Sequence, residues 1–206
     1  MNTKTNNKEQ LILEVAEKHF IEKGFAGAKT MEIANEAGVN HALLHYYYRT
    51  KENLFNRIFE EKATKLMESF SVNFDNDSSF FDKVKNVIEA HFDFIKENPK
   101  LPIFILREII ADSNRKSFII NNLLPVGKDL HDKFKTTIWS EMKKGTIRPV
   151  KTVDLLLNII SLNVFAFIAA QIFYDIETES DSEKLQIFLE ERKKNNVKVI
   201  ISSLKP

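Results

Sequence analysis

The chain has 206 residues, of which 43% are hydrophobic and 29% charged, as in an ordinary soluble globular protein of one large or two small domains. Cysteine is absent, which excludes disulfides and thiolate chemistry, and the net charge of +1 neither supports nor excludes a nucleic-acid partner. Only five glycines and five prolines occur, which favours long helices over a turn-rich β fold. The polar first residues lack the apolar core of a signal peptide, so we expect a cytoplasmic protein.

The first apolar stripe has helical spacing and predicts a helix that Gly24 ends. His19 lies on this stripe, so we interpret it as a core or pocket histidine and not as a catalyst. A short loop then leads to Thr30, whose hydroxyl we expect to cap the next helix. The stripe consists of Leu11, Ile12, Val15, Ala16, His19 and Phe20.

Residues 30–49 have the apolar pattern of a DNA-binding helix-turn-helix, in which two short helices cross at a steep angle. Ala34 is small enough to let the second helix approach the first, and Gly38 falls where the chain must turn. Leu44 and Tyr47, three residues apart, are expected to point from the second helix back to the first. Replacing Tyr47 by alanine is therefore predicted to destabilise this unit.

The remaining segments predict further helices and no strands, so the fold class is all-α. Thr50 can cap a helix over residues 51–73, which we expect to link the N-terminal unit mechanically to the C-terminal part of the chain. Polar residues 75–78 form the break after it. Two capping boxes, Ser79 with Asp82 and Ser180 with Glu183, each mark a helix start. The later helices are expected over about residues 79–95, 103–112, 115–123, 126–142, 152–176 and 181–204.

The segment 153–174 is apolar on nearly all faces and about as long as a membrane span. Polar residues such as Asp154, Asn158 and Asn163 interrupt it, and no basic flank orients it. A helix that is apolar all round can equally be buried in protein. We therefore favour a core and subunit-interface helix over a membrane anchor.

The N-terminal residues resemble the TetR family of bacterial transcription regulators. The resemblance runs through Ala37-Gly38-Val39-Asn40, then Leu44, and then Tyr47-Tyr48-Arg49-Thr50-Lys51-Glu52-Asn53-Leu54-Phe55. It implies a helix-turn-helix DNA-binding domain over residues 1–50 and a helical ligand-binding and dimerisation domain over residues 51–206. The last two helices would pair in a four-helix bundle. The chain departs from the family pattern at Ala42, Leu43, His45 and Tyr46, which concerns the DNA contacts and not the fold.

On the second helix of the motif, the outward face is expected to hold His41, Ala42, His45 and Tyr46. Ala42 could touch a thymine methyl group, and Asn40 is either an N-cap or a base reader. Hydroxyl and ring N–H groups of His45, Tyr46 and Tyr47 are expected to donate to phosphates. Thr30 and Lys51 are further expected phosphate contacts. The full set of expected DNA-binding residues is Thr30, Asn40, His41, Ala42, Leu43, His45, Tyr46, Tyr47 and Lys51.

Histidines suggest two alternatives that we consider weaker. His41 and His45 are four residues apart and could hold a metal on one helix face, but no third ligand is evident. An enzyme using His91 or His131 would need a catalytic set that the sequence does not supply. We therefore expect no metal, no cofactor and no enzymatic activity.

For the C-terminal domain, we expect an apolar ligand pocket that includes His91, Phe104, Trp139 and Asn158, and a dimer interface that includes Phe165, Ile172, Leu185 and Phe188. The function implied is that of a homodimeric regulator, with two recognition helices in successive major grooves of a palindromic operator. A small, largely apolar ligand would release it by moving the helix over residues 51–73. An activator or a co-repressor-dependent regulator is the alternative, and no membrane partner is expected.

Overall fold

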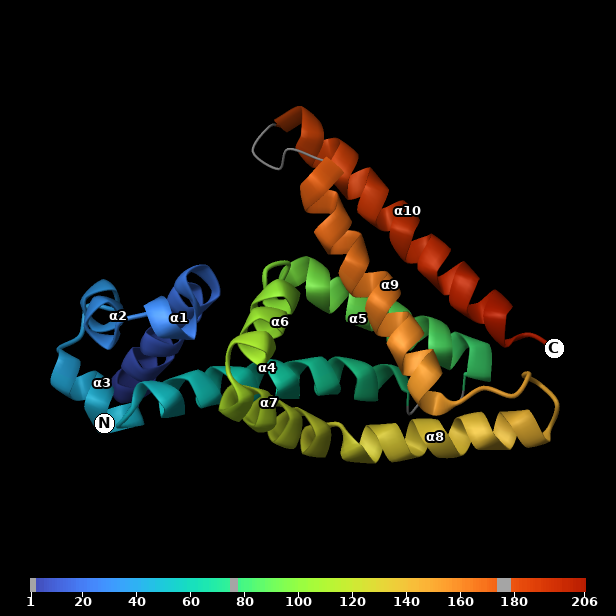
Figure 1. The fold of residues 1–206 in the computed structure, drawn as a ribbon, viewed down its shortest axis with the longest axis horizontal. Coiled ribbons are helices and arrows are strands. Elements are labelled where there is room, and N and C mark those ends of the chain that lie inside the picture. The colour runs from blue at the N-terminus through green and yellow to red at the C-terminus, as the bar shows by residue number, and fades with distance from the viewer. Residues whose placement is uncertain (1–2, 75–77, 174–178) are drawn as a thin grey trace. The chain divides into compact units, whose positions relative to one another are not determined.

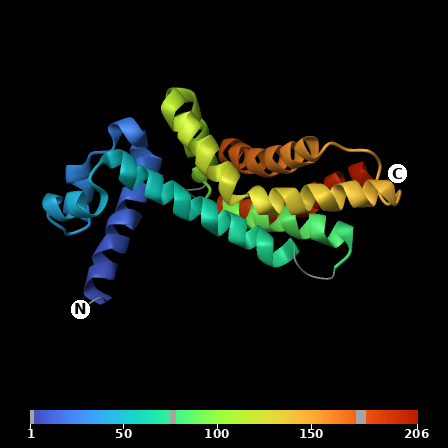
Figure 2. The ribbon, with the colours of Figure 1, turned by 90° about the horizontal axis from the view of Figure 1, so that it is seen from below.

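A computed structural model of the chain describes residues 3–74, 78–173 and 179–206, which fold into helices without a strand over these ranges (Figures 1 and 2). The helix positions agree with the sequence prediction to within a few residues. They are α1 (Thr3–Gly27), α2 (Thr30–Glu36), α3 (His41–Tyr48), α4 (Lys51–Phe74), α5 (Phe80–Glu97), α6 (Leu101–Ala111), α7 (Ser113–Val126), α8 (Lys128–Lys143), α9 (Thr152–Phe173) and α10 (Glu179–Leu204).

Several predicted helix ends are confirmed. Gly24 interrupts α1 with a φ of 73°, in the left-handed region that glycine adopts without steric cost. The Thr50 hydroxyl accepts a hydrogen bond from the Asn53 N–H at 3.1 Å, at the start of α4. Ser79 caps α5 by accepting from the Asp82 N–H at 3.2 Å. The predicted break at residues 75–77 and the side chain of Ser180 lie outside the described part of the chain.

The chain divides into two compact units. The first combines Met1–Thr64 with Ile103–Leu124, and the second combines Lys65–Pro102 with Pro125–Pro206. The first unit therefore extends beyond residue 50, where we expected the DNA-binding domain to end, and it includes most of α6 and α7. Polar contacts between α6 and α1, and aromatic contacts between α6 and α4, are the physical reason.

The core of the first unit is aromatic where α1, α4 and α6 meet. Phe55 is central to it, with ring centroids 5.3 Å from Phe20, 5.1 Å from Phe25, 4.6 Å from Phe59 and 5.9 Å from Phe104. Aromatic pairs at such distances contribute beyond the area that they bury. These rings fix the start of α4 against the end of α1.

In the second unit, α5, α9 and α10 pack together, and α8 packs on α9. One apolar cluster lies towards the C-terminal end of α10 and the other lies around Phe92 and Phe167, whose ring centroids are 4.8 Å apart. Between them, Asn163 of α9 is fully buried and bonds to both neighbouring helices. The side chains that form the first cluster are Phe80, Val84, Val87, Ile88, Phe134, Ile138, Ile147, Leu155, Ile159, Ile200 and Leu204.

By length and composition, one helix of the described chain could cross a membrane, over Thr152–Ala170 in α9. Its buried side, with Leu155, Ile159 and Asn163, packs within the second unit. A third of this window is buried, and a core helix of a soluble protein passes the same hydropathy test. The opposite side of α9 stays exposed in the single chain, with Val153, Leu157, Ile160, Phe165, Ile172 and Phe173 on it.

Candidate nucleic-acid interface

The turn between α2 and α3 has the geometry that a helix-turn-helix requires. Gly38 has a φ of 64°, and the Val39 N–H donates to the Ala34 carbonyl at 3.0 Å, which closes the turn. Asn40 is the N-cap of α3, because its Oδ1 accepts a hydrogen bond from the Leu43 N–H at 2.7 Å. Of the two roles expected for Asn40, the structure thus shows the cap.

The residue that anchors α3 to the rest of the unit is Tyr48, and the expectation that Tyr47 has this role is wrong. Leu44 and Tyr48 are the buried residues of α3, whereas Tyr47 is only half-buried. Both three- and four-residue spacings lie on one face of a helix, and here the four-residue spacing faces α1. The Tyr48 hydroxyl donates to the Glu9 carbonyl at 3.4 Å. Burial raises its pKa well above the ordinary value.

Thr30 joins the two helices of the motif instead of capping the first. Lys29 occupies the N-cap position of α2, and no side chain caps that helix. The expected cap is therefore wrong, since Thr30 already lies inside the first turn. Its hydroxyl oxygen lies 3.0 Å from His41 Nε2, at the first residue of α3. The contact links the start of α2 to the start of α3.

The two glutamates of α2 are paired with cations on α1 and on the preceding loop. Glu36 lies 2.8 Å from Lys18 Nζ and 2.8 Å from His19 Nε2. Hydrogen bonds from Lys18, and then from His19, lower the pKa of Glu36 to about 2. Glu32 is 2.7 Å from Lys23 Nζ, and this bond lowers its pKa as well. Both acids are thus neutralised locally, which reduces the repulsion that a phosphate backbone would meet near the motif.

The exposed surface of α3 and its end consists of Ala42, His45, Tyr46 and Arg49. Tyr46 protrudes most, with 77% of its surface accessible. The Arg49 side chain has no partner among the described residues, so its guanidinium is available to a phosphate or a base edge. Sequence reasoning identifies Arg49 as a local charge but does not select it as a contact. Its position directly after the predicted recognition helix is the signal that could have found it.

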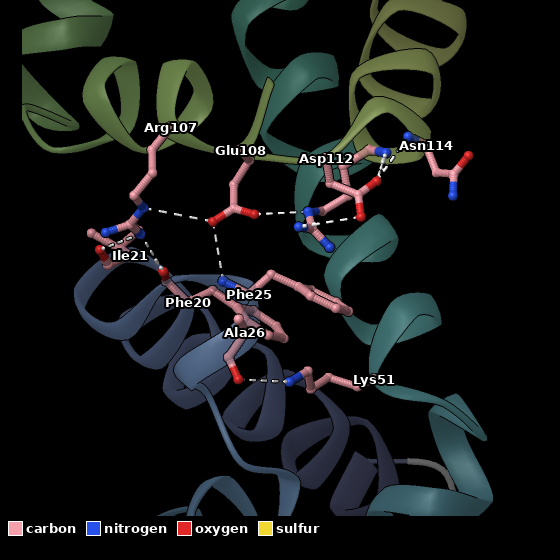
Figure 3. A network of polar contacts seen from close by, with 10 residues as sticks. Phe20, Ile21, Phe25, Ala26, Lys51, Arg107, Glu108, Asp112 and Asn114 are labelled. Atoms are coloured by element: carbon pink, nitrogen blue, oxygen red, sulfur yellow. Dashed lines mark hydrogen bonds and ion pairs between the residues drawn. The ribbon is translucent and has the colours of Figure 1, made fainter. Parts of the chain in front are cut away.

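Lys51 has an internal role in the first unit. Its ammonium group donates to the Ala28 carbonyl at 2.8 Å and lies 4.6 Å from the centre of the Phe25 ring. A second carbonyl, that of Ala26, lies 3.5 Å away (Figure 3). The expected phosphate contact of Lys51 would therefore have to use the one N–H group that these carbonyls leave.

The break in α1 at Gly24 is held by two side chains of α6 (Figure 3). Glu108, only 3% exposed, accepts a hydrogen bond from the Phe25 N–H at 3.1 Å. Arg107 Nη2 lies 3.1 Å from the Phe20 carbonyl and 3.2 Å from that of Ile21. Backbone N–H and C=O groups at a helix end lack intrahelical partners. Side chains of α6 thus supply the hydrogen-bond partners that α1 loses at Gly24. We name the contacts of Arg107, Glu108 and Arg115 with α1 the α6 clasp.

Arg115 of α7 completes the α6 clasp. Its Nε lies 2.9 Å from Glu108 Oε2, and its guanidinium group lies 4.6 Å from the centre of the Phe25 ring. Asp112 accepts from the Arg115 backbone N–H at 3.0 Å, and this bond holds the pKa of that carboxyl below its ordinary value. Residues more than 80 positions from α1 in the sequence thus become part of the DNA-binding head.

The candidate pocket residues of the sequence analysis lie in different surroundings. His91 is buried in α5 within the second unit, and Phe104 is buried on Phe55 and Phe59 within the first. Trp139 is 55% exposed, with Lys143 Nζ 3.5 Å from its ring centre, and Asn158 lies on the exposed side of α9. In the single chain, Trp139 and Asn158 are therefore exposed. Their helices carry them outward because Ile138 and Ile159, one position away, take the core-facing positions.

The candidate interface residues fall into two pairs. Phe165 and Ile172 are exposed on α9, at 64% and 71%, so both are available to a partner. Leu185 and Phe188 of α10 are half-buried and pack on the cluster around Phe92. Among the described residues, no group of three potential metal ligands occurs, at His41 and His45 or elsewhere.

Comparison with known proteins places this geometry in a family. Residues 12–58 match the family model of bacterial regulatory proteins of the tetR family. Over 119 residues, the chain is 30% identical to the probable HTH-type transcriptional regulator YttP of Bacillus subtilis, covering 55% of this chain and 54% of YttP. It is 29% identical to the nucleoid occlusion factor SlmA of Mannheimia succiniciproducens over 80 residues, 39% of this chain and 37% of SlmA. The matches thus span less than two thirds of the length of these two relatives.

The fold of the whole chain is similar to that of solved regulators. FadR from Bacillus subtilis in complex with stearoyl-CoA superimposes with a TM-score of 0.72 at 18% identity, over 94% of this chain and 98% of FadR. The motif lies within the residues that match the family model, and the helices beyond them follow the same architecture. The N-terminal helix-turn-helix therefore matches the tetR family of bacterial regulatory proteins over residues 12–58, and the chain as a whole shares the fold of solved regulators.

Proposed function

We propose that the protein is a homodimeric repressor that binds a palindromic DNA operator and is released by a small, largely apolar ligand. The observation that carries the proposal is the surface of α3. It presents Ala42, His45, Tyr46 and Arg49 to solvent on a rigid helix-turn-helix whose neighbouring acids are already paired. A recognition helix of this kind fits a major groove, and its ends fit the phosphates that flank the groove.

A second copy of the chain is the partner that the exposed side of α9 suits. This side carries large apolar side chains from Val153 to Phe173, beside the polar Asp154, Asn158 and Ser161, and Ile187 and Val199 of α10 are also about half exposed. Exposed apolar surface of this extent on adjacent helices is typical of an interface. We therefore propose a four-helix contact between α9 and α10 of two copies. It would place two recognition helices on one operator, with residues 1–50 making the DNA contacts.

The dimer proposal predicts that Phe165→Asp gives a monomer, because a charge would be buried in the apolar contact. Sedimentation velocity measures the state directly. A matched control is Lys135→Asp, a charge change at an exposed position of α8, which is not part of the proposed contact. If the Phe165→Asp protein sediments as a dimer, the interface lies elsewhere.

The ligand would bind the helical domain beyond residue 50. The likeness to FadR, which was solved with stearoyl-CoA, supports a ligand with a long apolar part. Because α6 and α7 belong to the same compact unit as the helix-turn-helix, a shift of residues 103–124 would reach the DNA-binding head through the α6 clasp. The sequence alone points to a movement of α4, and we propose that α4 and α6 move together. The movement regulates DNA binding only if the ligand binds the two conformers differently.

The first test is selection of random double-stranded DNA by the purified protein, followed by binding measurements at two salt concentrations. Enrichment of a palindrome with steep salt dependence is the expected result, because dimeric heads neutralise several phosphates in each half-site. Enrichment only when an acyl thioester or a free fatty acid is added would favour a co-repressor-dependent regulator. Folded, dimeric protein that enriches no sequence under either condition would contradict the proposal.

Regulators of this kind act on DNA in the cytoplasm, and we propose that location, with no membrane partner and no catalytic activity. The apolar α9 is then explained by the core on one side and the second copy on the other. Recovery of the protein from lysed cells only with detergent would contradict the location.

A further inference from the structure

His45 on the exposed side of α3 is held in one tautomer. Its Nδ1 lies 2.9 Å from the Arg49 carbonyl oxygen. A carbonyl oxygen can only accept, so Nδ1 must carry the proton of this hydrogen bond. In the neutral ring, Nε2 is then an unprotonated acceptor. No contact of this nitrogen is found among the described residues, and the side chain is exposed.

The ring of His45 is also fixed in orientation. The Arg49 N–H donates to the His45 carbonyl at 2.9 Å, so two hydrogen bonds join the same two residues. Arg49 has a φ of 59°, which turns its carbonyl back toward the side chain of His45. From the other side, the His41 ring packs edge to face at 4.3 Å, and His41 is itself bonded to Thr30 at 3.0 Å. Such support preorganises Nε2 for one partner.

In this neutral tautomer, His45 has no free N–H for the phosphate contact that the sequence suggested. Phosphate oxygens are acceptors, and the only ring N–H of the neutral imidazole is already used by Arg49. In the major groove, the hydrogen-bond donors are the exocyclic amino groups, N6 of adenine and N4 of cytosine. The neighbouring exposed groups on this surface, the Tyr46 hydroxyl and the Arg49 guanidinium, can donate to phosphate or guanine. The acceptor Nε2 of His45 is instead complementary to the amino groups of adenine and cytosine.

We infer that His45 determines operator specificity by accepting, at Nε2, a hydrogen bond from the amino group of an adenine or a cytosine in the major groove. This inference rests on the proposed function and names the base chemistry that the same site reads. It selects adenine or cytosine, in one position of each half-site, over guanine and thymine, which present acceptors there.

The test removes single atoms from the selected operator. At pH 8, where an imidazole is neutral, each adenine is replaced in turn by purine, which lacks the N6 amino group, and each cytosine by 2-pyrimidinone, which lacks N4. One such replacement is expected to weaken binding of the unaltered protein by about 3- to 10-fold for each half-site, the effect of one hydrogen bond. His45→Ala should weaken binding to the intact operator by a similar factor. It should show no further loss on the replaced operator.

Two variants serve as controls. His45→Gln keeps an acceptor in its amide oxygen, so it should retain sensitivity to the same base. Tyr46→Phe changes the adjacent exposed side chain. Its effect on affinity should be independent of the base replacement, so the two fold-changes should multiply. Melting curves of each variant by circular dichroism establish that α3 is intact.

Three outcomes would overturn the inference. If His45→Ala weakens binding but no amino-group deletion cancels its effect, His45 acts on the DNA backbone or by packing, and the proposed function still stands. If His45→Ala binds every operator as the unaltered protein does, His45 contributes nothing to binding, and the proposed function again stands. If folded, dimeric protein selects no DNA sequence at all, the proposed function fails and this inference fails with it.

Discussion

Each of the two compact units buries polar side chains between helices, but the first uses charges and the second uses neutral amides. In the first, Glu108 is 3% exposed and holds the Phe25 N–H and the Arg115 side chain. In the second, Asn163 donates to the Ile88 carbonyl at 2.9 Å and accepts from Asn196 at 2.9 Å. The amides of the second unit fix the register of α5, α9 and α10 without burying a net charge between them. In the first unit, a movement of either partner would leave a buried charge unpaired, which costs free energy.

The contrast indicates that the contacts of the second unit hold its helices in a fixed register, whereas those of the first unit respond more strongly to a movement. Asn163 also lies 3.2 Å from His91 Nδ1. An amide nitrogen only donates, so His91 is the acceptor. The amides bond to one another, to His91 and to the backbone, and one cation joins them at the edge, where Arg192 Nη2 donates to Asn196 Oδ1 at 2.9 Å. The α6 clasp instead ties the DNA-binding head to a segment more than 80 residues away through carboxylate and guanidinium groups. Such contacts weaken when their geometry changes, because a buried charge then loses its partner.

The strongest destabilisation should come from replacing Tyr48. This change tests how much of the stability of the first unit depends on apolar packing and not on the charged contacts. Tyr48→Ala should lower the free energy of unfolding by about 3–5 kcal/mol, the usual effect of truncating a buried aromatic ring. Tyr48 is 6% exposed. Urea unfolding followed by circular dichroism measures the loss. Tyr47→Ala, at the half-buried neighbour, is the matched control and should be much milder; equal losses would contradict the placement of α3.

The next effect tests the α6 clasp itself. Glu108→Ala should destabilise the first unit by about 3 kcal/mol, because it leaves the Phe25 N–H and Arg115 without their buried partner. Glu108→Gln keeps an acceptor for Phe25 and should recover part of this loss. Asp112→Asn removes a more exposed charge that also faces Arg115 at 3.6 Å but keeps an acceptor for the first N–H groups of α7, so it should change stability by less than about 1 kcal/mol. A Glu108→Ala protein as stable as the original would mean that the charged contacts contribute nothing.

The mildest of the three effects concerns the neutral network of the second unit. Burial lowers the pKa of His91 to about 4, below the 6.5 of an ordinary histidine. The unfolded chain therefore binds a proton before the folded chain does, so the stability contribution is complete above pH 6.5 and is lost as the pH falls toward 4. Between pH 8 and pH 5 the loss should be about 2 kcal/mol.

The measurement for His91 compares urea unfolding of the original protein and of His91→Gln at both pH values. The glutamine keeps an acceptor for Asn163 but cannot titrate, so the variant should lack this part of the pH dependence. Carboxylates that titrate in both proteins cancel in the comparison. Identical pH profiles would show that His91 is accessible to protons in the folded chain.

The sequence predicted the features that local pattern decides. Helix positions, the glycine turns and the caps at Asn40, Thr50 and Ser79 depend on neighbouring residues, and the structure confirms them. Tyr47 and Tyr48 could not be separated, because both lie within reach of the face that Leu44 defines. The Thr30 cap was wrong because one residue decides whether a hydroxyl lies before or inside a first turn.

Long-range pairing could not be predicted from the sequence. Nothing local to Glu108 indicates that it accepts from Phe25, 83 residues earlier. Similarly, the apolar stripe of α5 indicated that His91 is buried, but not that Asn163 would contact it. The exposed positions of Trp139 and Asn158 depend on which face of α8 and α9 meets the core, and these nearly all-apolar or mixed helices do not reveal that face.

Gly24 bears on the engineering of hybrid regulators from this chain. A Cβ atom at this position would lie 3.3 Å from Arg107 Cζ and 3.3 Å from Glu108 Oε1, in addition to the strain of its φ of 73°. The absence of a side chain at Gly24 is thus required by the close packing of Arg107 and Glu108. A hybrid that joins residues 1–50 to the body of another regulator would separate them. A transplant that keeps Met1–Thr64 together with Ile103–Leu124 would carry the fitted surfaces along with the reading head.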